Sequence, residues 1–232
     1  MEIAYLLVHS PLLGPRSWTP VAQRLRAAGA AVVVPSLVGI GAGGPPFGPP
    51  VGEAVGAAAR ELPAGQPVAV VAHSSAGLFV PVVVEALAGT VAANVFVEAA
   101  LPARSGPTRP ATDERLAVLR GMAEDGILPQ WTEWWDPAGL PALFPDPETW
   151  RAVSAEQPRL PLSYYEQPVP NPPGWERLPC GYIRFSPAYE KVAAEARDRG
   201  WPVIHIPGAH LHQLVDPDAV AGAIVSLTEE RP

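Results

Sequence analysis

Short apolar runs recur along the chain with little alternation between apolar and polar positions. Runs of this kind are typical of strands that are buried on both faces, as in a parallel sheet. They span residues 3–8, 31–34, 68–71, 95–97, 182–185 and 203–206. Each run therefore predicts one buried strand.

Helical patterns separate most of these runs. Thr19 and Pro20 provide an N-cap and a first-turn proline, and Gly29 follows at the position where such a helix would end. Further helices are predicted over 77–87, over 190–199 and from Asp216 to about Leu227. The alternation of strand and helix predicts an α/β fold with a doubly wound, mostly parallel sheet.

The alternation is interrupted once, between about Ala103 and Glu176. This stretch is rich in proline, and two helix patterns lie within it, at 112–124 and beginning at 146–148. It holds five of the seven tryptophans, namely Trp131, Trp134, Trp135, Trp150 and Trp175. We therefore predict a core formed by residues 1–102 and 177–232, with residues 103–176 inserted as a helical cap.

Composition narrows the functional classes. The chain has 232 residues, of which 48% are hydrophobic and 17% charged, so it can bury one substantial core and is not expected to be disordered. The net charge of −7 and the absence of a basic cluster exclude nucleic acid as an expected partner. Cys180 is the only cysteine, and no apolar stretch is long enough for a membrane span. We expect a soluble, cytoplasmic protein; its oligomeric state is not indicated.

Residues 72–77, Ala-His-Ser-Ser-Ala-Gly, join a predicted buried strand to a predicted helix. A serine on so sharp a turn needs small residues two positions away on either side, and Ala72 and Ala76 meet this requirement for Ser74. Ser75 is the rival nucleophile, but His73 is too large for the equivalent flank. We therefore predict that Ser74 is a nucleophile, with an ordinary helix-capping serine as the alternative.

The sequence here resembles the α/β-hydrolase family, and in particular its compact members similar to methylesterases and hydroxynitrile lyases. The resemblance rests on His9, Ser10 and Trp18, on residues 72–77, on 96–102 and on 207–217. It implies that Ser74 attacks a carbonyl carbon, that the triad follows in the order serine, acid, histidine, and that no cofactor is needed. The family's opening hairpin is missing, so about six strands are expected.

Five histidines are candidates for the base. His210 lies in a loop after a buried strand and before the terminal helix, from which it can reach the carboxyl edge of the sheet. His212 is the main competitor and otherwise a pocket-lining residue, whereas His205 is expected to be a core residue. A metal site formed by His210, His212, Asp216 and Asp218 has no familiar ligand spacing, so no metal is predicted.

The acid is less clearly indicated. The family usually places it after the strand before last, where residues 185–190 offer only Glu190, too far into the helix start. Glu98 ends an apolar strand, and a carboxylate there needs a donor such as a histidine N–H. Some family members, including a lactone hydrolase acting on a fungal macrolactone, carry a glutamate at this strand. Glu98 is therefore the predicted acid, ahead of Glu190 and Asp216.

An oxyanion hole requires two aimed N–H groups. Ser75 supplies the first. In the family the second comes from the residue after a His-Gly pair, but here His9 and Ser10 are followed by Pro11, which has no N–H. Leu12 is the predicted second donor, with the Ser10 hydroxyl or an incomplete hole as alternatives.

Gly39, Gly41 and Gly44 match G-x-G-x-x-G after a strand, as in dinucleotide-binding loops. The prolines between 45 and 50 are expected to forbid the helix that this motif needs, so no nucleotide site is predicted. We expect a loop that borders the entrance of the pocket.

These residues together predict a serine hydrolase that cleaves an ester, lactone or thioester of an apolar small molecule. A lyase, cyclase or dehydratase with the same residues is the alternative, and a binding module that has kept the fold is a third. The residues expected to line the substrate pocket are His9, Ser10, Trp131, Trp134, Trp135, Tyr164, Tyr165 and His212.

Overall fold

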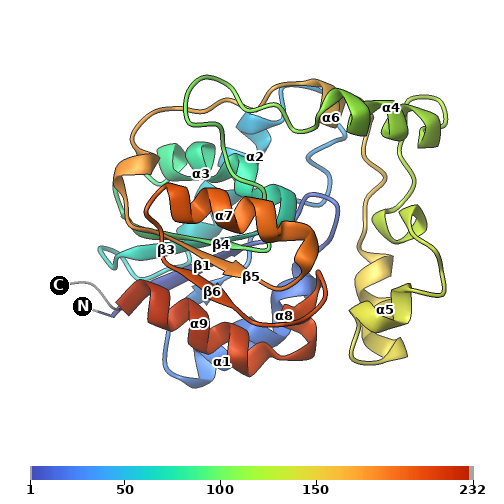
Figure 1. Cartoon of the computed structure of the whole chain (residues 1–232). Helices are drawn as coiled ribbons and strands as arrows, with labels where there is room; N and C mark the ends of the chain where they lie inside the picture. Colours follow the sequence, from blue (N-terminus) through green and yellow to red (C-terminus); the bar gives the residue numbers. More distant parts are fainter. Residues whose placement is uncertain (1, 230–232) are drawn as a thin grey trace.

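A six-stranded parallel sheet forms the centre of the protein (Figure 1), as seen in a computed structural model that describes residues 2–229. The strand order is β2-β1-β3-β4-β5-β6, and every neighbouring pair is parallel. The strands are β1 (Ala4–Val8), β2 (Val32–Val33), β3 (Val68–His73), β4 (Val91–Val97), β5 (Cys180–Arg184) and β6 (Val203–His205). The predicted doubly wound parallel sheet of about six strands is thereby confirmed.

Helices cover both faces of the sheet (Figure 1). On one face lie α1 (Thr19–Ala27) and α9 (Pro217–Glu229), and on the other lie α2 (Gly48–Ala59), α3 (Val80–Ala86) and α7 (Glu190–Asp198). Successive strand residues alternate between the two cores: Tyr5 and Leu7 pack on the side of α1 and α9, whereas Leu6 and Val8 pack on the other side. Because both sides are apolar, the strands read as uninterrupted apolar runs.

Two local expectations were wrong. The prolines after Gly44 do not prevent a helix, because α2 begins at Gly48 and places Pro49 and Pro50 in its first turn, where backbone N–H groups have no helical partner. This helix still begins after the glycine motif rather than inside it. His205 is exposed instead of buried in the core, because β6 is the edge strand and only partly covered.

Between β4 and β5 the chain leaves the sheet in the segment that includes residues 103–176, the stretch predicted to be a helical cap, and we call this segment the cap. Its helices are α4 (Asp113–Met122), α5 (Pro147–Ala155) and α6 (Ser163–Glu166), with the 3₁₀ helices η3 (Trp131–Trp134), η4 (Leu140–Leu143) and η5 (Trp175–Arg177). The α-helices of the cap lie at the end of the sheet away from the chain termini, which is the carboxyl end of the strands (Figure 1).

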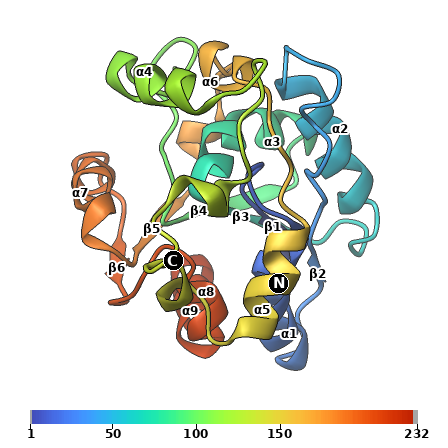
Figure 2. The same ribbon diagram turned by 90° about the vertical axis from the view of Figure 1, so that its right-hand side faces the viewer.

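Different helices of the cap face different parts of the core. Figure 2 shows α4 and α6 on the side of α2 and α3, and α5 on the side of α1. Just after α5, the Glu156 carboxylate accepts a hydrogen bond from the Arg16 amide at 2.9 Å. The remaining short elements are η1 (Pro15–Trp18), η2 (Ser74–Phe79), η6 (Pro187–Tyr189) and α8 (His212–Val215). No helix in the described part of the chain is both long and apolar enough to cross a membrane.

The turn after β3 packs directly against the segment that follows β4. A Cβ atom at Gly77 would lie 2.1 Å from the carbonyl oxygen of Ala100, whose amide donates to the carbonyl of Ser74 at 3.1 Å. Neither backbone can move without disturbing the other. Only glycine therefore allows this approach.

We expect Gly77→Ala to lower the free energy of unfolding by about 1–3 kcal/mol or more, because the added methyl group overlaps a backbone oxygen. Gly121→Ala is the matched control: Gly121 lies in the last turn of α4, a Cβ there meets no atom within 4 Å, and alanine is favoured over glycine within a helix by about 0.5–1 kcal/mol. Urea unfolding of both variants measures the difference. Equal stabilities would contradict the close contact.

Candidate active site

Ser74 occupies the sharp turn between β3 and η2. Its φ of 57° lies in the left-handed region, which costs a residue other than glycine about 1–2 kcal/mol. The flanking Ala72 and Ala76 are completely buried, so larger side chains would not fit there. The turn holds the Ser74 hydroxyl at the wall of a cavity instead of inside the core.

His210 approaches Ser74 from the loop between β6 and α8. Its Nε2 lies 3.0 Å from Ser74 Oγ. The imidazole stacks on the Tyr189 ring, with 5.3 Å between centroids and 17° between planes, and it also contacts Trp131. Burial lowers the pKa of His210 well below its usual value, and the nearby His73 lowers this pKa further. The imidazole is therefore neutral at neutral pH and can accept a proton.

His73, the residue before the nucleophile, holds the backbone of the base. Its Nε2–H donates to the carbonyl oxygen of His210 at 3.0 Å, and the two rings lie 4.9 Å apart. Burial lowers the pKa of His73 to about 4, so this imidazole is also neutral. Its Nδ1 has no hydrogen-bond partner among the described residues.

Tyr189 is a site residue that the sequence reasoning missed. It lies in η6, just after β5, where only a carboxylate was sought. Burial raises the pKa of Tyr189 to about 12, against the effect of a hydrogen bond to Ser74. Its place beyond the carboxyl end of a sheet strand was the signal that could have identified it.

Glu98 follows β4 with a φ of 44° and is completely buried. Its carboxylate accepts hydrogen bonds from the amides of Phe185 and Ser186, at 2.6 and 3.0 Å, and from the Ser186 hydroxyl. Burial raises the pKa of Glu98, and these hydrogen bonds oppose the rise. No hydrogen bond or ion pair joins Glu98 to His210 in residues 2–229. The structure thus does not show the predicted contact, because Glu98 binds the start of the loop that carries Tyr189.

The other candidate acids are also bound elsewhere. Glu190 is exposed and pairs with Arg184 at 2.7 Å and with Arg197 at 3.2 Å. The Asp216 carboxylate accepts from the amide of Ala219 at 3.0 Å, at the start of α9. Neither carboxylate has a contact with His210 in the described chain.

The two predicted oxyanion donors belong to a polar network beside Ser74. The Leu12 amide donates to Ser10 Oγ at 3.3 Å, Ser10 Oγ lies 2.9 Å from Ser75 Oγ, and Tyr164 donates to Ser75 Oγ at 3.2 Å. These three bonds use three of the four N–H and O–H protons of the network. One serine hydroxyl proton therefore remains without an acceptor among the described residues.

A cavity of about 550 Å³ opens in front of Ser74. Aromatic and aliphatic side chains form most of its wall, which is typical of sites for small organic ligands. It is lined by Leu12, Ser74, Ser75, Leu78, Ala100, Pro110, Arg115, Trp131, Trp134, Trp135, Asp136, Gly139, Leu140, Leu143, Tyr165, Ser186, Ala188, Tyr189 and His210. Of the residues expected to line the pocket, the three clustered tryptophans and Tyr165 do so.

Four residues that were expected in the pocket lie outside its wall. His9 is buried, where Nδ1 donates to the carbonyl of Ser10 and Nε2 accepts from the amide of Leu37. Ser10 and Tyr164 lie behind Ser75 and bind its hydroxyl. The ring of His212 packs against Phe185. The glycine-rich loop around Gly41 does not border the cavity either.

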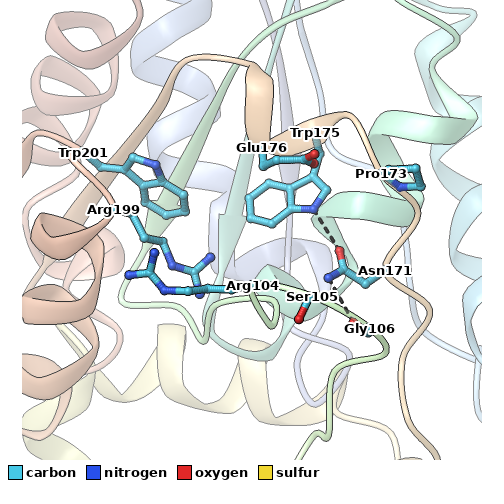
Figure 3. A pocket seen from close by; sticks show the side chains of 9 residues that line it. All are labelled: Arg104, Ser105, Gly106, Asn171, Pro173, Trp175, Glu176, Arg199 and Trp201. Atoms are coloured by element: carbon cyan, nitrogen blue, oxygen red, sulfur yellow. Dashed lines mark hydrogen bonds between the residues drawn. The ribbon is translucent and has the colours of Figure 1, made fainter.

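A second cavity of about 460 Å³ lies between the ends of the cap and the end of α7 (Figure 3). Trp175 and Trp201 form part of its wall, and the guanidinium of Arg199 is held by Glu195 and by the carbonyl of Pro102. Neither Ser74 nor His210 lines it. Among the described residues, no group of three or more His, Cys, Asp or Glu side chains could hold a metal ion.

Comparison with known proteins identifies the family and the fold. The model of the family described as "Alpha/beta hydrolase family" matches residues 5–223. No curated protein sequence matches. Among solved structures, an extracellular α/β-hydrolase from a Paenibacillus species has a TM-score of 0.77 at 14% identity, covering 98% of this chain and 100% of the other.

Two further solved structures are similar over nearly their whole length. Tomato methylketone synthase I, in complex with 2-tridecanone, has a TM-score of 0.72 at 15% identity, covering 100% of both chains. Polyneuridine aldehyde esterase has a TM-score of 0.67 at 15% identity, covering 98% of this chain and 99% of the other. At such identities the likeness shows the shared fold.

The buried histidines predict a loss of stability in mild acid. Burial lowers the pKa of both His9 and His73 to about 4, so the unfolded chain binds more protons than the folded chain between about pH 6.5 and pH 4. The free energy of unfolding should fall by about 1.4 kcal/mol per pH unit for each histidine in this range. Urea unfolding from pH 7 to 5 measures how steeply the free energy of unfolding depends on pH. In His73→Gln this slope should be smaller by about 1.4 kcal/mol per pH unit. An unchanged slope would show that His73 titrates normally.

Proposed function

The chain belongs to the alpha/beta hydrolase family, and from this premise we propose that it is a serine hydrolase that cleaves an ester, lactone or thioester of an apolar small molecule. The observation that carries the proposal is the 3.0 Å contact between Ser74 Oγ and His210 Nε2 at the wall of an aromatic cavity. A hydroxyl and a neutral imidazole in hydrogen-bond contact form the pair that acyl transfer requires. In this reading the enzyme resembles a carboxylesterase and needs no cofactor.

In the proposed reaction Ser74 Oγ attacks the substrate carbonyl carbon while its proton passes to His210 Nε2. The tetrahedral intermediate collapses, and the imidazolium returns the proton to the leaving alcohol or thiol. Water then gives a proton to His210 and attacks the acyl-enzyme. Collapse of the second intermediate releases the acid and restores the Ser74 hydroxyl.

The oxyanion would be held by the Ser75 amide together with a hydroxyl of the Ser10–Ser75 pair. Ser75 N–H lies at the beginning of η2, where backbone amides have no partner within the helix. The spare hydroxyl proton of the network supplies a second donor in place of the amide that Pro11 lacks. The Leu12 amide, predicted as that donor, is bound to Ser10 Oγ in the structure.

We propose Glu98 as the acidic member of the site, acting through its charge and through the loop that it holds. It binds Ser186, which lines the same cavity as His210, and its strained backbone is typical of functional positions. A negative charge there would stabilise the imidazolium that forms during the reaction. Cys180, the single cysteine, suits a reducing compartment, so a cytoplasmic location is part of the same proposal.

A non-hydrolytic enzyme such as a lyase, cyclase or dehydratase is the second candidate. It is favoured by one observation: Pro11 provides no amide, and the Leu12 amide is already bound to Ser10. A weak oxyanion hole slows acyl transfer by about a hundredfold to a thousandfold for each missing donor. Simple proton transfer at the same serine and histidine would be less affected.

Labelling and hydrolysis separate the two candidates. We expect a fluorophosphonate to modify Ser74 and the enzyme to release nitrophenol from 4-nitrophenyl butyrate, with Ser74→Ala abolishing the label and lowering kcat roughly a thousandfold or more. Ser105→Ala, an exposed serine outside this cavity, is the control. Absence of both label and hydrolysis in the wild type would favour the non-hydrolytic candidate.

The pH dependence of kcat/KM tests the acid. Because burial lowers the pKa of His210, the rate should persist below pH 6.5 and fall only at lower pH. Glu98→Gln should lower kcat by roughly a hundredfold or more and move the acid limb to still lower pH, because the imidazolium loses its stabilising charge.

Glu190→Gln is the matched control, because Glu190 is exposed, does not line the catalytic cavity and pairs with Arg184 and Arg197. Its activity and acid limb should stay within about twofold of the wild type. If Glu98→Gln lowers kcat but leaves the acid limb in place, Glu98 only holds the loop. If Glu190→Gln lowers the activity more than Glu98→Gln does, Glu190 is the acid and Glu98 is not.

A further inference from the structure

Arg115 is a cation without a counterion in the wall of the catalytic cavity. It lies in the first turn of α4, and its guanidinium carbon is 5.4 Å from the centroid of the Trp134 ring. Both residues line the same cavity as Ser74. Within residues 2–229 no carboxylate forms an ion pair with the Arg115 guanidinium, and no hydrogen bond to it is found.

The neighbouring arginines of the cap differ in this respect. Arg109 pairs with Asp113 at 2.5 Å, and Arg120 pairs with Glu166 at 2.8 Å. Both are exposed on the surface, where such pairs contribute little. Arg115 faces the cavity instead, so its unpaired charge is available to whatever the cavity binds.

The charge of Arg115 acts on two tyrosines of the same cavity wall. It lowers the pKa values of Tyr165 and Tyr189, which both line the cavity and whose pKa values burial raises. The Tyr189 ring stacks on the imidazole of His210, which contacts Ser74. Because Arg115 and Ser74 line the same cavity, one ligand could place a polar group at Arg115 and its scissile carbonyl at Ser74.

The way Arg115 is held favours a carboxylate. Its guanidinium carbon lies over the Trp134 ring, and its N–H groups have no partner among the described residues. Such N–H groups can bind a carboxylate through two parallel hydrogen bonds. Asp136 is the other charged residue of the wall, but it is exposed and its carboxylate accepts from the amide of Ala138. The remaining wall is mostly apolar, so the rest of the ligand should be apolar.

We propose that Arg115 forms an anion subsite, and that the substrate is an apolar ester or thioester carrying a carboxylate remote from the bond that is cleaved. The substrate class rests on the proposed hydrolase function, whereas the subsite itself does not. Neutral esters of the same shape would be cleaved, but less efficiently. The carboxylate would fix the orientation of the substrate in the cavity that Arg115 and Ser74 both line.

Matched substrates test the subsite. Mono(4-nitrophenyl) esters of the diacids from succinate to sebacate are each compared with the neutral ester in which an isopropyl group replaces the terminal carboxylate. We expect kcat/KM for the best diacid to exceed that of its neutral counterpart about tenfold or more, as for hydrogen bonds to charged groups. In Arg115→Gln this ratio should fall to about one, mainly through KM.

Arg120→Gln, on the same helix but outside the cavity, is the control and should keep the wild-type ratio. Arg115→Lys retains the charge without the planar fork and should recover part of the preference. If the wild type hydrolyses the neutral esters at least as well as every diacid ester, the anion subsite is wrong although the hydrolase function stands.

Equilibrium binding separates failure of the subsite from failure of the function. Octanoate should bind to Ser74→Ala more tightly than 1-octanol by about tenfold, and adding Arg115→Gln should remove that difference. If no ester is cleaved but octanoate binding depends on Arg115, the subsite stands and the hydrolase proposal fails. If octanoate binding is unaffected by Arg115→Gln, the subsite is refuted whatever the catalytic result.

Discussion

The sharp turn after β3 makes three consecutive residues reach three distant parts of the chain. His73 donates to the backbone of His210, Ser74 contacts the imidazole of the same residue, and Ser75 binds the hydroxyls of Ser10 and Tyr164. The left-handed conformation of Ser74 makes this divergence possible, and its cost is offset by the contacts it creates. This one turn therefore positions the loop after β6, the loop after β1 and the cap.

Much of the fold and the reacting pair could be predicted from sequence because the relevant signals are local. Apolar runs without alternation indicate strands covered on both faces, and small residues around Ser74 indicate a turn too tight for larger ones. Parallel strands bring their carboxyl ends to one edge, so a histidine in the loop after the last strand can reach that serine. Family and sheet are confirmed, and the structure brings Ser74 and His210 into contact.

The predictions that failed concern residues whose role depends on the tertiary contacts of their side chains. Glu98 was expected to orient the base, yet amide and hydroxyl donors at Phe185 and Ser186 lie closer to its carboxylate. Tyr189 enters the site only because that loop folds back over His210, which no sequence period reveals. Pro49 and Pro50 were read as helix breakers, although the first turn of a helix tolerates them. The path of a loop and the hydrogen-bond partners of a buried side chain are set by tertiary structure, so local sequence patterns do not reveal them.

The sheet ends in strands of only two and three residues, β2 on one side and β6 on the other. An incoming strand from another molecule would find few unpaired backbone groups to bind at either border. A continuous intermolecular sheet is consequently disfavoured, even though the central strands are long apolar runs with high β-propensity. The brevity of the outer strands thus works against growth of the parallel sheet into fibres.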